Sequence, residues 1–116
     1  MPAYLVNHLR LPNDVPRPDA LTYLENVEAT FRPYGGRWLA LDQPVESVEG
    51  AWPGSVVLME FPDMERARRW YDSPEYQAIL PLRTDNAISD VIFVEGVGPQ
   101  FTSREWAGAA RSAMSA

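Results

Sequence analysis

Residues 55–72 read "SVVLMEFPDMERARRWYD", and they decide the fold class because a strand leads directly into a helix. Residues 55–61 are dense in apolar and β-branched side chains, which is typical of a strand. Asp63 is a favoured residue for capping a helix N-terminus. Apolar side chains then recur at helical spacing, which predicts one packed face made of Met64, Ala67 and Tyr71.

The segments on either side supply the rest of a β-α-β-β-α-β order. Strands are predicted at residues 3–11, 37–49 and 88–95, the second interrupted near Pro44 because proline lacks a ladder donor. A helix is predicted over residues 18–31. Its apolar face is expected to contain Leu24, Val27 and Phe31.

The stretch "WYDSPEYQAILPLR" at 70–83 predicts a hinge within the second helical region. Ser73, Pro74 and Glu75 form a helix start, with a cap, a fixed φ and an acid near the positive helix end. The helix therefore breaks and restarts there, and Pro81 is expected to interrupt it again. The restarted helix is predicted to pack through Tyr76, Ile79 and Leu80.

This order predicts an α+β, ferredoxin-like domain over residues 1–97, with both helical regions on one face of an antiparallel sheet. The strand stretches "VVLM" at 56–59 and "VIFV" at 91–94 do not alternate apolar with polar residues. Both faces of the sheet therefore need cover, and a homodimer packed sheet to sheet would provide it. Residues 98–116 form a C-terminal extension, in which "TSRE" at 102–105 predicts a short helix.

Composition narrows the class of partner. The 116-residue length predicts a single domain. The net charge of −6, with no basic stripe, argues against nucleic acid as a partner. No apolar run is long enough to span a membrane, and the first residues lack the features of a signal peptide, which favours a cytoplasmic location. The absence of cysteine excludes disulfides and sulfur-based zinc sites.

Four stretches resemble a known family: "YGGRWL" (34–39), "EGAWPG" (49–54), "LMEFPDMERARRWYDSPEYQAILPLR" (58–83) and "VIFVEGV" (91–97). Across roughly residues 3–97, the chain resembles the bacterial family called domain of unknown function 1330, part of the dimeric α+β barrel superfamily. That resemblance implies a ferredoxin-like fold but no defined activity. Superfamily members include cofactor-independent monooxygenases, isomerases, haem enzymes and ligand-sensing domains, which hold ligands between sheet and helices. The chain departs from the family in its long loop "LPNDVPRPDA" and in the extension after residue 97.

Arg83 is the first candidate functional residue, since it follows the segment in which the helix is expected to end. A guanidinium presents a planar fork of donors that suits a carboxylate or an enolate. The structural alternative is an ion pair with Asp85 or Glu95. Sequence alone leaves both interpretations open.

His8 and Glu60 are the best candidate acid–base pair. We expect the first strand to lie beside the third and run parallel to it, which brings the two residues to a similar depth. A carboxylate that orients an imidazole is the arrangement of a general base. The alternative is a structural histidine whose hydrogen bonds are satisfied at the dimer face.

Three further residues are candidates for ligand binding: Tyr71, Tyr76 and Arg37. The tyrosine hydroxyls could instead find structural partners, and Arg37 could form an ion pair with Glu46 or Glu49. A single histidine without cysteine argues against a transition-metal site, and no glycine-rich phosphate loop is present. We therefore expect no metal and no other cofactor.

Two functional hypotheses follow. The first is a homodimeric protein that binds a small organic molecule and acts without a cofactor, by proton abstraction and isomerisation or by monooxygenation. In this hypothesis His8 is the base, Glu60 orients it, and Arg83 stabilises negative charge. The second is a non-catalytic ligand-binding or assembly module whose C-terminal helix packs on the dimer or on another partner.

Overall fold

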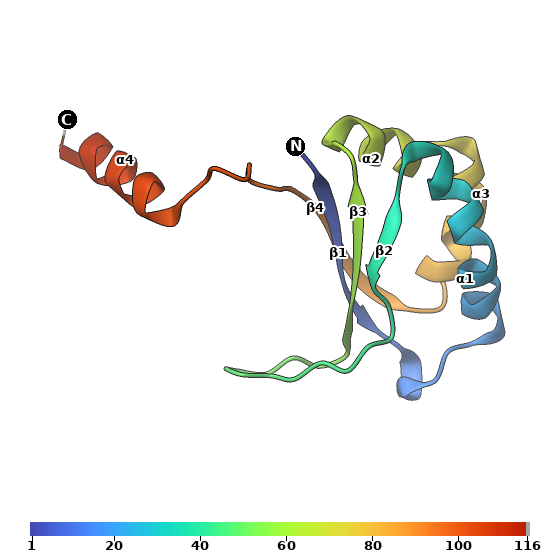
Figure 1. Ribbon diagram of the computed structural model, residues 1–116. Coiled ribbons are helices and arrows are strands. Elements are labelled where there is room, and N and C mark those ends of the chain that lie inside the picture. The colour runs from blue at the N-terminus through green and yellow to red at the C-terminus, as the bar shows by residue number, and fades with distance from the viewer. Residues whose placement is uncertain (116) are drawn as a thin grey trace.

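The computed structural model describes residues 1–115 and shows one α+β domain followed by an outlying helix (Figure 1). The β-α-β-β-α-β order is confirmed. The strands are β1 (Ala3–Arg10), β2 (Arg37–Ala40), β3 (Ser55–Phe61) and β4 (Ile88–Glu95). The helices are α1 (Pro18–Phe31), α2 (Met64–Tyr71), α3 (Pro74–Thr84) and α4 (Ser103–Ser115), with short 3-10 turns at Pro12–Asp14 and Arg32–Tyr34.

The four strands form one antiparallel sheet in the order β2-β3-β1-β4. The parallel pairing predicted for β1 and β3 is wrong, since these two strands are antiparallel. The crossover through α1 makes β2 run in the same direction as β1. The chain then turns back from β2 into β3, which lies between them and must run opposite to both.

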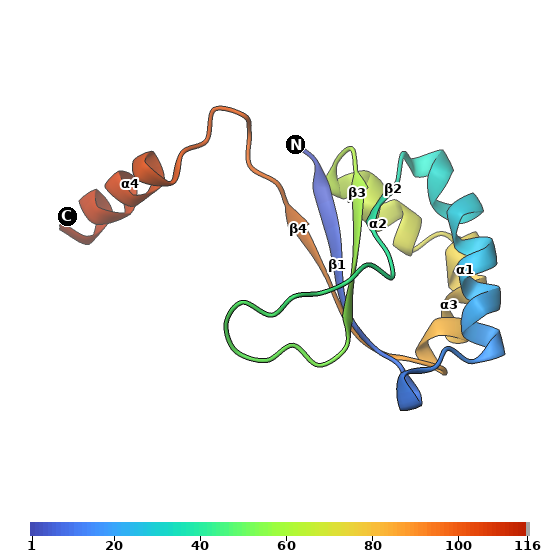
Figure 2. The ribbon, with the colours of Figure 1, turned by 60° about the horizontal axis from the view of Figure 1, so that its bottom comes forward.

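Helices α1, α2 and α3 all cover one face of the sheet, as Figure 2 shows. Between this face and the helices lies the hydrophobic core, which includes Ala3, Leu5, Met59 and Phe61 from the sheet and Tyr23, Val27, Phe31, Ala67, Trp70 and Tyr76 from the helices. Burying such side chains stabilises the fold by roughly 1.5–3 kcal/mol for each large one. The core therefore fixes which face of the sheet the helices cover.

The opposite, bare face of the sheet carries no helix within residues 1–115, although Trp52 and Pro53 contact His8 on it. Its central strand contributes Val6, whose register partners are Leu58 on β3 and Ile92 on β4. Ile92 is 57% exposed. The bare face thus carries an apolar row across three strands, flanked by the ion pairs of Arg10 with Asp90 and of Arg37 with Glu60. The helices cover only the other face.

The hinge predicted before α3 is confirmed, but the break at Pro81 is wrong. The Ser73 hydroxyl accepts a hydrogen bond from the Tyr76 backbone N–H at 3.2 Å, and α3 then continues through Pro81 to Thr84. Proline removes only the bond to the carbonyl of Gln77, and Gln77 is exposed to water that can replace the lost donor. The continuous helix carries Arg83 toward the sheet.

Two packed helix faces differ slightly from their predictions. On α1 the buried residues are Tyr23, Val27 and Phe31, while Leu24 is 39% exposed. On α2 the buried aromatic residue is Trp70, and Tyr71 is half-buried. The rest of each predicted face is largely retained, and one residue is replaced by its neighbour, because the larger ring of Tyr23 or Trp70 fills the core.

Two segments extend away from the domain on the side of the bare sheet face (Figures 1 and 2). One is the loop 41–54, which replaces most of the strand predicted at 37–49. The other is the segment after β4, which ends in α4 and exposes Trp106 at 64%. Among residues 1–115, no helix is long and apolar enough to cross a bilayer.

Candidate functional site

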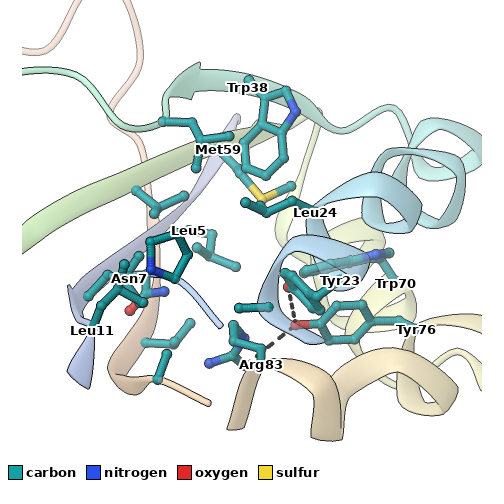
Figure 3. Close-up of a pocket in the computed structure, with 17 residues that line it drawn as sticks. Leu5, Asn7, Leu11, Tyr23, Leu24, Trp38, Met59, Trp70, Tyr76 and Arg83 are labelled. Atoms are coloured by element: carbon teal, nitrogen blue, oxygen red, sulfur yellow. Dashed lines mark hydrogen bonds between the residues drawn. The ribbon is translucent and has the colours of Figure 1, made fainter. Parts of the chain in front are cut away.

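A cavity of about 90 Å³ lies between the core face of the sheet and helices α1 and α3 (Figure 3). Its walls are mostly apolar, with Leu5, Val57, Met59 and Val91 from the sheet and Leu24, Trp38 and Trp70 around them. Leu24 is partly exposed, so the cavity reaches solvent beside α1. The indole N–H groups of Trp38 and Trp70 are bonded to Glu28 and Thr30. The other lining side chains with hydrogen-bonding groups are Asn7, Tyr23, Tyr76 and Arg83.

Tyr23, Tyr76 and Arg83 form a polar cluster that links α1 to α3. The hydroxyls of Tyr23 and Tyr76 lie 2.8 Å apart, and Arg83 Nη2 makes a longer contact of 3.5 Å with the Tyr76 hydroxyl. The Arg83 guanidinium also lies 5.9 Å from the centre of the Tyr23 ring. The cluster therefore places a cation and two phenols at one side of an apolar cavity.

The surroundings of Tyr23 and Arg83 raise the pKa of each, which favours the protonated form that each already has at neutral pH. Burial, together with the adjacent Tyr76 hydroxyl, raises the pKa of Tyr23 well above its ordinary value. Burial alone would lower the pKa of Arg83, but Tyr76 and Tyr23 outweigh it, and the net direction is upward. The tyrosine is thus a neutral hydrogen-bonding group, and the arginine is a permanent cation.

Arg83 forms no ion pair with any residue in the range 1–115. The predicted alternative partners, Asp85 and Glu95, do not pair with it, and the ion pairs that do form use Arg10, Arg32, Arg37, Arg66 and Arg69. Arg83 is half-buried. A half-buried guanidinium without a carboxylate retains unused donor capacity, which an anionic ligand could use.

Asn7 is a second polar residue of the cavity, and sequence reasoning missed it. The residue is 5% exposed, and its Oδ1 has no hydrogen-bond partner among the described residues. The alternating pattern of β1 could have identified it, because Asn7 is the one polar residue in the series Ala3, Leu5, Asn7, Leu9. A polar residue at a core-facing position is an informative exception.

Tyr23 was also missed, although its spacing contains a signal. Tyr23, Val27 and Phe31 recur every four residues and are all buried on α1. Tyr76, which was predicted as a ligand-binding residue, lines the cavity beside it. Tyr71 does not line the cavity, because its ring packs against Trp70, Tyr76 and Phe93.

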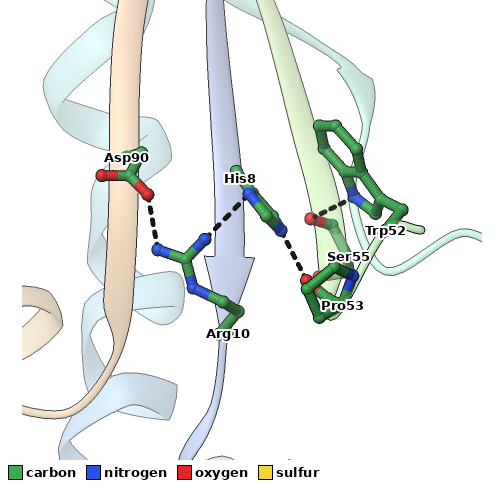
Figure 4. Close-up of polar contacts among 6 residues, drawn as sticks. All are labelled: His8, Arg10, Trp52, Pro53, Ser55 and Asp90. Carbon is green, nitrogen blue, oxygen red and sulfur yellow. Dashed lines mark hydrogen bonds and ion pairs between the residues drawn. The ribbon is translucent and has the colours of Figure 1, made fainter. Parts of the chain in front are cut away.

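His8 lies on the bare face of the sheet, away from the cavity (Figure 4). Its Nδ1 accepts a hydrogen bond from Arg10 at 2.8 Å, and its Nε2 lies 2.5 Å from the carbonyl oxygen of Pro53. Because arginine only donates, Nδ1 is the acceptor and Nε2 carries the proton given to Pro53. The Trp52 ring stacks on the imidazole with 4.3 Å between centroids. Both ring nitrogens are therefore already engaged.

The predicted pair of His8 and Glu60 does not form. In the antiparallel register His8 lies opposite Val56, and Glu60 lies opposite Tyr4. Glu60 instead accepts a hydrogen bond from Arg37 at 3.0 Å. Arg37 was predicted to form an ion pair with Glu46 or Glu49, and it pairs with Glu60 instead. Arg37 and Glu60 both lie on the bare face of the sheet, away from the cavity.

The predicted site residues are therefore divided between the two faces of the sheet. Arg83 and Tyr76 meet at the cavity, whereas His8, Glu60 and Arg37 belong to the bare face. Within residues 1–115, no group of three or more His, Cys, Asp or Glu side chains is arranged to hold a metal ion. The cavity residues themselves include no carboxylate and no imidazole.

The sequence profile of the family described as "Domain of unknown function (DUF1330)" matches residues 2–97. The chain belongs to the DUF1330 family. The match covers the whole α+β domain, and α4 lies outside it. No curated protein matches the chain.

Solved structures show that the DUF1330 domain has a ferredoxin-like fold. A protein of unknown function from Rhodopseudomonas palustris, RPA0582, is 18% identical, with 84% of each chain covered and a TM-score of 0.65. SnoaB from Streptomyces nogalater, a cofactor-independent oxygenase, is 10% identical, with 87% of this chain and 98% of that chain covered and a TM-score of 0.58. At these identities the likeness concerns the fold alone, and it agrees with the resemblance seen in the sequence.

Proposed function

We propose that this DUF1330 protein binds a small organic molecule in the cavity between its sheet and helices. The observation that carries the proposal is an apolar cavity bordered by a half-buried arginine, Arg83, that pairs with no carboxylate among residues 1–115. Apolar walls with a few polar groups are the usual composition of small-molecule sites. The volume of about 90 Å³ is below the roughly 150 Å³ that accommodates benzene in an engineered cavity, so even a ligand with a single aromatic ring would fill it and extend into the opening beside α1.

A more specific version of the proposal is that the protein is an enzyme whose cavity catalyses a cofactor-independent reaction. The likeness in fold to SnoaB supports it, and Arg83 with the two phenols would stabilise the anion of an acidic carbon. In a monooxygenation, O₂ places one oxygen atom on the carbon as a carbonyl, the carbon loses two hydrogens, and the second oxygen leaves as water. His8 and Glu60 have no role in this version, since they lie on the opposite face of the sheet.

A homodimer through the bare sheet face is part of the same proposal. Val6, Leu58 and Ile92 form an apolar row across three strands, and a second copy would cover it. Self-association by one shared face gives a closed two-fold pair. The cavities face away from this interface, so each copy would keep its own binding site.

A second candidate function, an assembly module, rests on α4. Among the described residues 1–115, this helix has no substantial contacts with any other element, and it exposes Trp106. Its segment is weakly basic, with Arg104 and Arg111 against Glu105, whereas the rest of the chain is acidic. These features support α4 as a contact for another copy or another protein, independently of the cavity.

The test of ligand binding is titration with indole, a neutral bicyclic probe whose second ring would lie in the opening beside α1, followed by saturation-transfer NMR. Ala20 lines the cavity, so Ala20→Trp should fill it and abolish the transfer to indole. Ala29 is an exposed alanine on the same helix, so Ala29→Trp is the matched control and should bind indole like the unmodified protein. Equal binding by both variants, or none by the unmodified protein, would sink the proposal.

A further inference from the structure

The polar groups of the cavity define what kind of molecule it would accept, an inference that rests on the proposed binding function. We propose that the ligand is a small, flat organic acid that also carries a hydroxyl group: its carboxylate pairs with Arg83, and its hydroxyl bonds to Asn7. The chemistry follows from these two side chains, which reach the cavity from α3 and β1 (Figure 3).

The negative charge is inferred from Arg83. Its contact with the Tyr76 hydroxyl is long, at 3.5 Å, and no described carboxylate pairs with it. A guanidinium has five donors in a planar fork, and a carboxylate is the group that uses two of them at once. The chain as a whole carries a net charge of −6, so the cation at this cavity is a local exception. An anion is favoured here by the site and disfavoured elsewhere on the surface.

The hydroxyl is inferred from Asn7. The side chain is nine-tenths buried on β1, lines the cavity, and leaves Oδ1 without a partner among residues 1–115. A buried amide without a partner costs roughly 1–3 kcal/mol, and a ligand that satisfies it recovers part of that cost. A hydroxyl can donate to Oδ1 and can equally accept from Nδ2, so it suits the side chain in either amide orientation.

The flat shape is inferred from the walls. Tyr23, Tyr76, Trp38 and Trp70 present aromatic rings around the cavity. Tyr23 and Tyr76 are already held by their mutual hydrogen bond, so their rings form fixed walls rather than mobile ones. Rings of this kind pack best against a flat, partly apolar molecule. A hydroxyl-bearing aromatic acid combines all three properties.

The test compares three probes: 3-hydroxybenzoate, its neutral analogue 3-hydroxybenzamide, and benzoate, which lacks the hydroxyl. Dissociation constants are measured by calorimetry for the unmodified protein, Arg83→Gln and Asn7→Leu. We expect 3-hydroxybenzoate to bind about tenfold or more tightly than the amide, because hydrogen bonds to a charged group are the stronger ones. Arg83→Gln should remove this preference for the acid over the amide. The isomer 4-hydroxybenzoate is measured in parallel, because the position of the hydroxyl on the ring decides whether it reaches Asn7.

The outcomes separate this inference from the proposed function. If the neutral amide binds as tightly as the acid, the cavity is a binding site but the charge assignment is wrong. If benzoate binds as tightly as both hydroxybenzoates, the hydroxyl assignment is wrong. It is also wrong if the hydroxybenzoates still bind more tightly than benzoate to Asn7→Leu. If neither these probes nor indole binds, the binding function itself fails. Circular dichroism of each variant shows that a loss of binding does not reflect unfolding.

Discussion

The hydroxyl of Tyr23 on α1 lies 2.8 Å from the hydroxyl of Tyr76 on α3, and this hydrogen bond joins the two helices beside the cavity. The rings meet edge to face, with centroids 6.1 Å apart. The contact holds the cavity wall and also positions Arg83, which touches both side chains. One pair of residues thus serves both the packing of the helices and the polar character of the site.

Loss of either hydroxyl should weaken the fold. We expect Tyr23→Phe and Tyr76→Phe each to lower the free energy of unfolding by about 1–2 kcal/mol, because each leaves a buried hydroxyl with a poorer partner. The double variant should lose less than the sum of the two, since the second change removes the stranded group. Urea denaturation measures all four proteins. If the two losses in the free energy of unfolding were strictly additive in the double variant, the two hydroxyls would not interact.

The raised pKa of Tyr23 predicts a loss of stability at alkaline pH. Burial favours the neutral phenol, so above about pH 10 the unfolded chain releases this proton while the folded chain keeps it. The unfolded state then binds fewer protons, and the free energy of unfolding falls as pH rises, at up to about 1.4 kcal/mol per pH unit for this group. Stability below pH 10 should not depend on it.

Urea denaturation between pH 9 and pH 11 tests this dependence. Tyr23→Phe should flatten the alkaline part of the profile. Tyr4→Phe, on the opposite face of the sheet, is the control and should keep the original slope. An unchanged slope in Tyr23→Phe would mean that the loss of stability arises elsewhere.

His8 should act on the loop and not on the ligand. It binds the Pro53 carbonyl and stacks on Trp52, so His8→Ala should release the loop 41–54 from the sheet. Hydrogen exchange of the amides in this loop should become several-fold faster, while indole binding in the cavity stays the same. If His8→Ala abolished indole binding without changing hydrogen exchange in the loop 41–54, His8 would have to be counted among the residues of the binding site.

The bare sheet face should carry the dimer contact. Ile92→Glu places a charge in the apolar row beside Val6, and burying it against a second copy would be costly. Light scattering after gel filtration should show a change from two chains to one. Leu21→Glu, an equally polar change at an exposed leucine of α1, should leave the dimer intact. Dimers in both variants would locate the interface elsewhere.

The domain should fold without its extension. Because α4 has no substantial contacts with other elements in the described part of the chain, a chain ended after residue 97 should unfold within a few degrees of the full chain's midpoint. Thermal unfolding by circular dichroism measures this. A large fall in the midpoint would contradict the division at residue 97. Retained stability with a loss of the dimer would instead assign α4 to the contact between copies.

Local patterns were sufficient for much of the fold. The helix starts at Asp63 and Ser73 were predicted correctly, because capping depends on a side chain and a backbone N–H only three residues apart. The paired apolar stretches 56–59 and 91–94 likewise indicated a sheet with two apolar faces. Arg83 and Tyr76 were identified as candidates because they lie on a helix whose start was well marked.

The composition of the site was decided by tertiary structure. His8 and Glu60 are equally far along their strands, but the antiparallel register of β1 and β3 places Glu60 opposite Tyr4. Strand direction follows from the order of elements across the whole domain, because the crossover through α1 makes β1 and β2 parallel and β3 lies between them, and not from the local pattern of either strand. Tyr23 and Asn7 lie far from Arg83 in the sequence, so only packing could bring them to one cavity. The sequence by itself determined the elements and their ends through interactions within a few residues, whereas the face, register and cavity depend on contacts between distant segments.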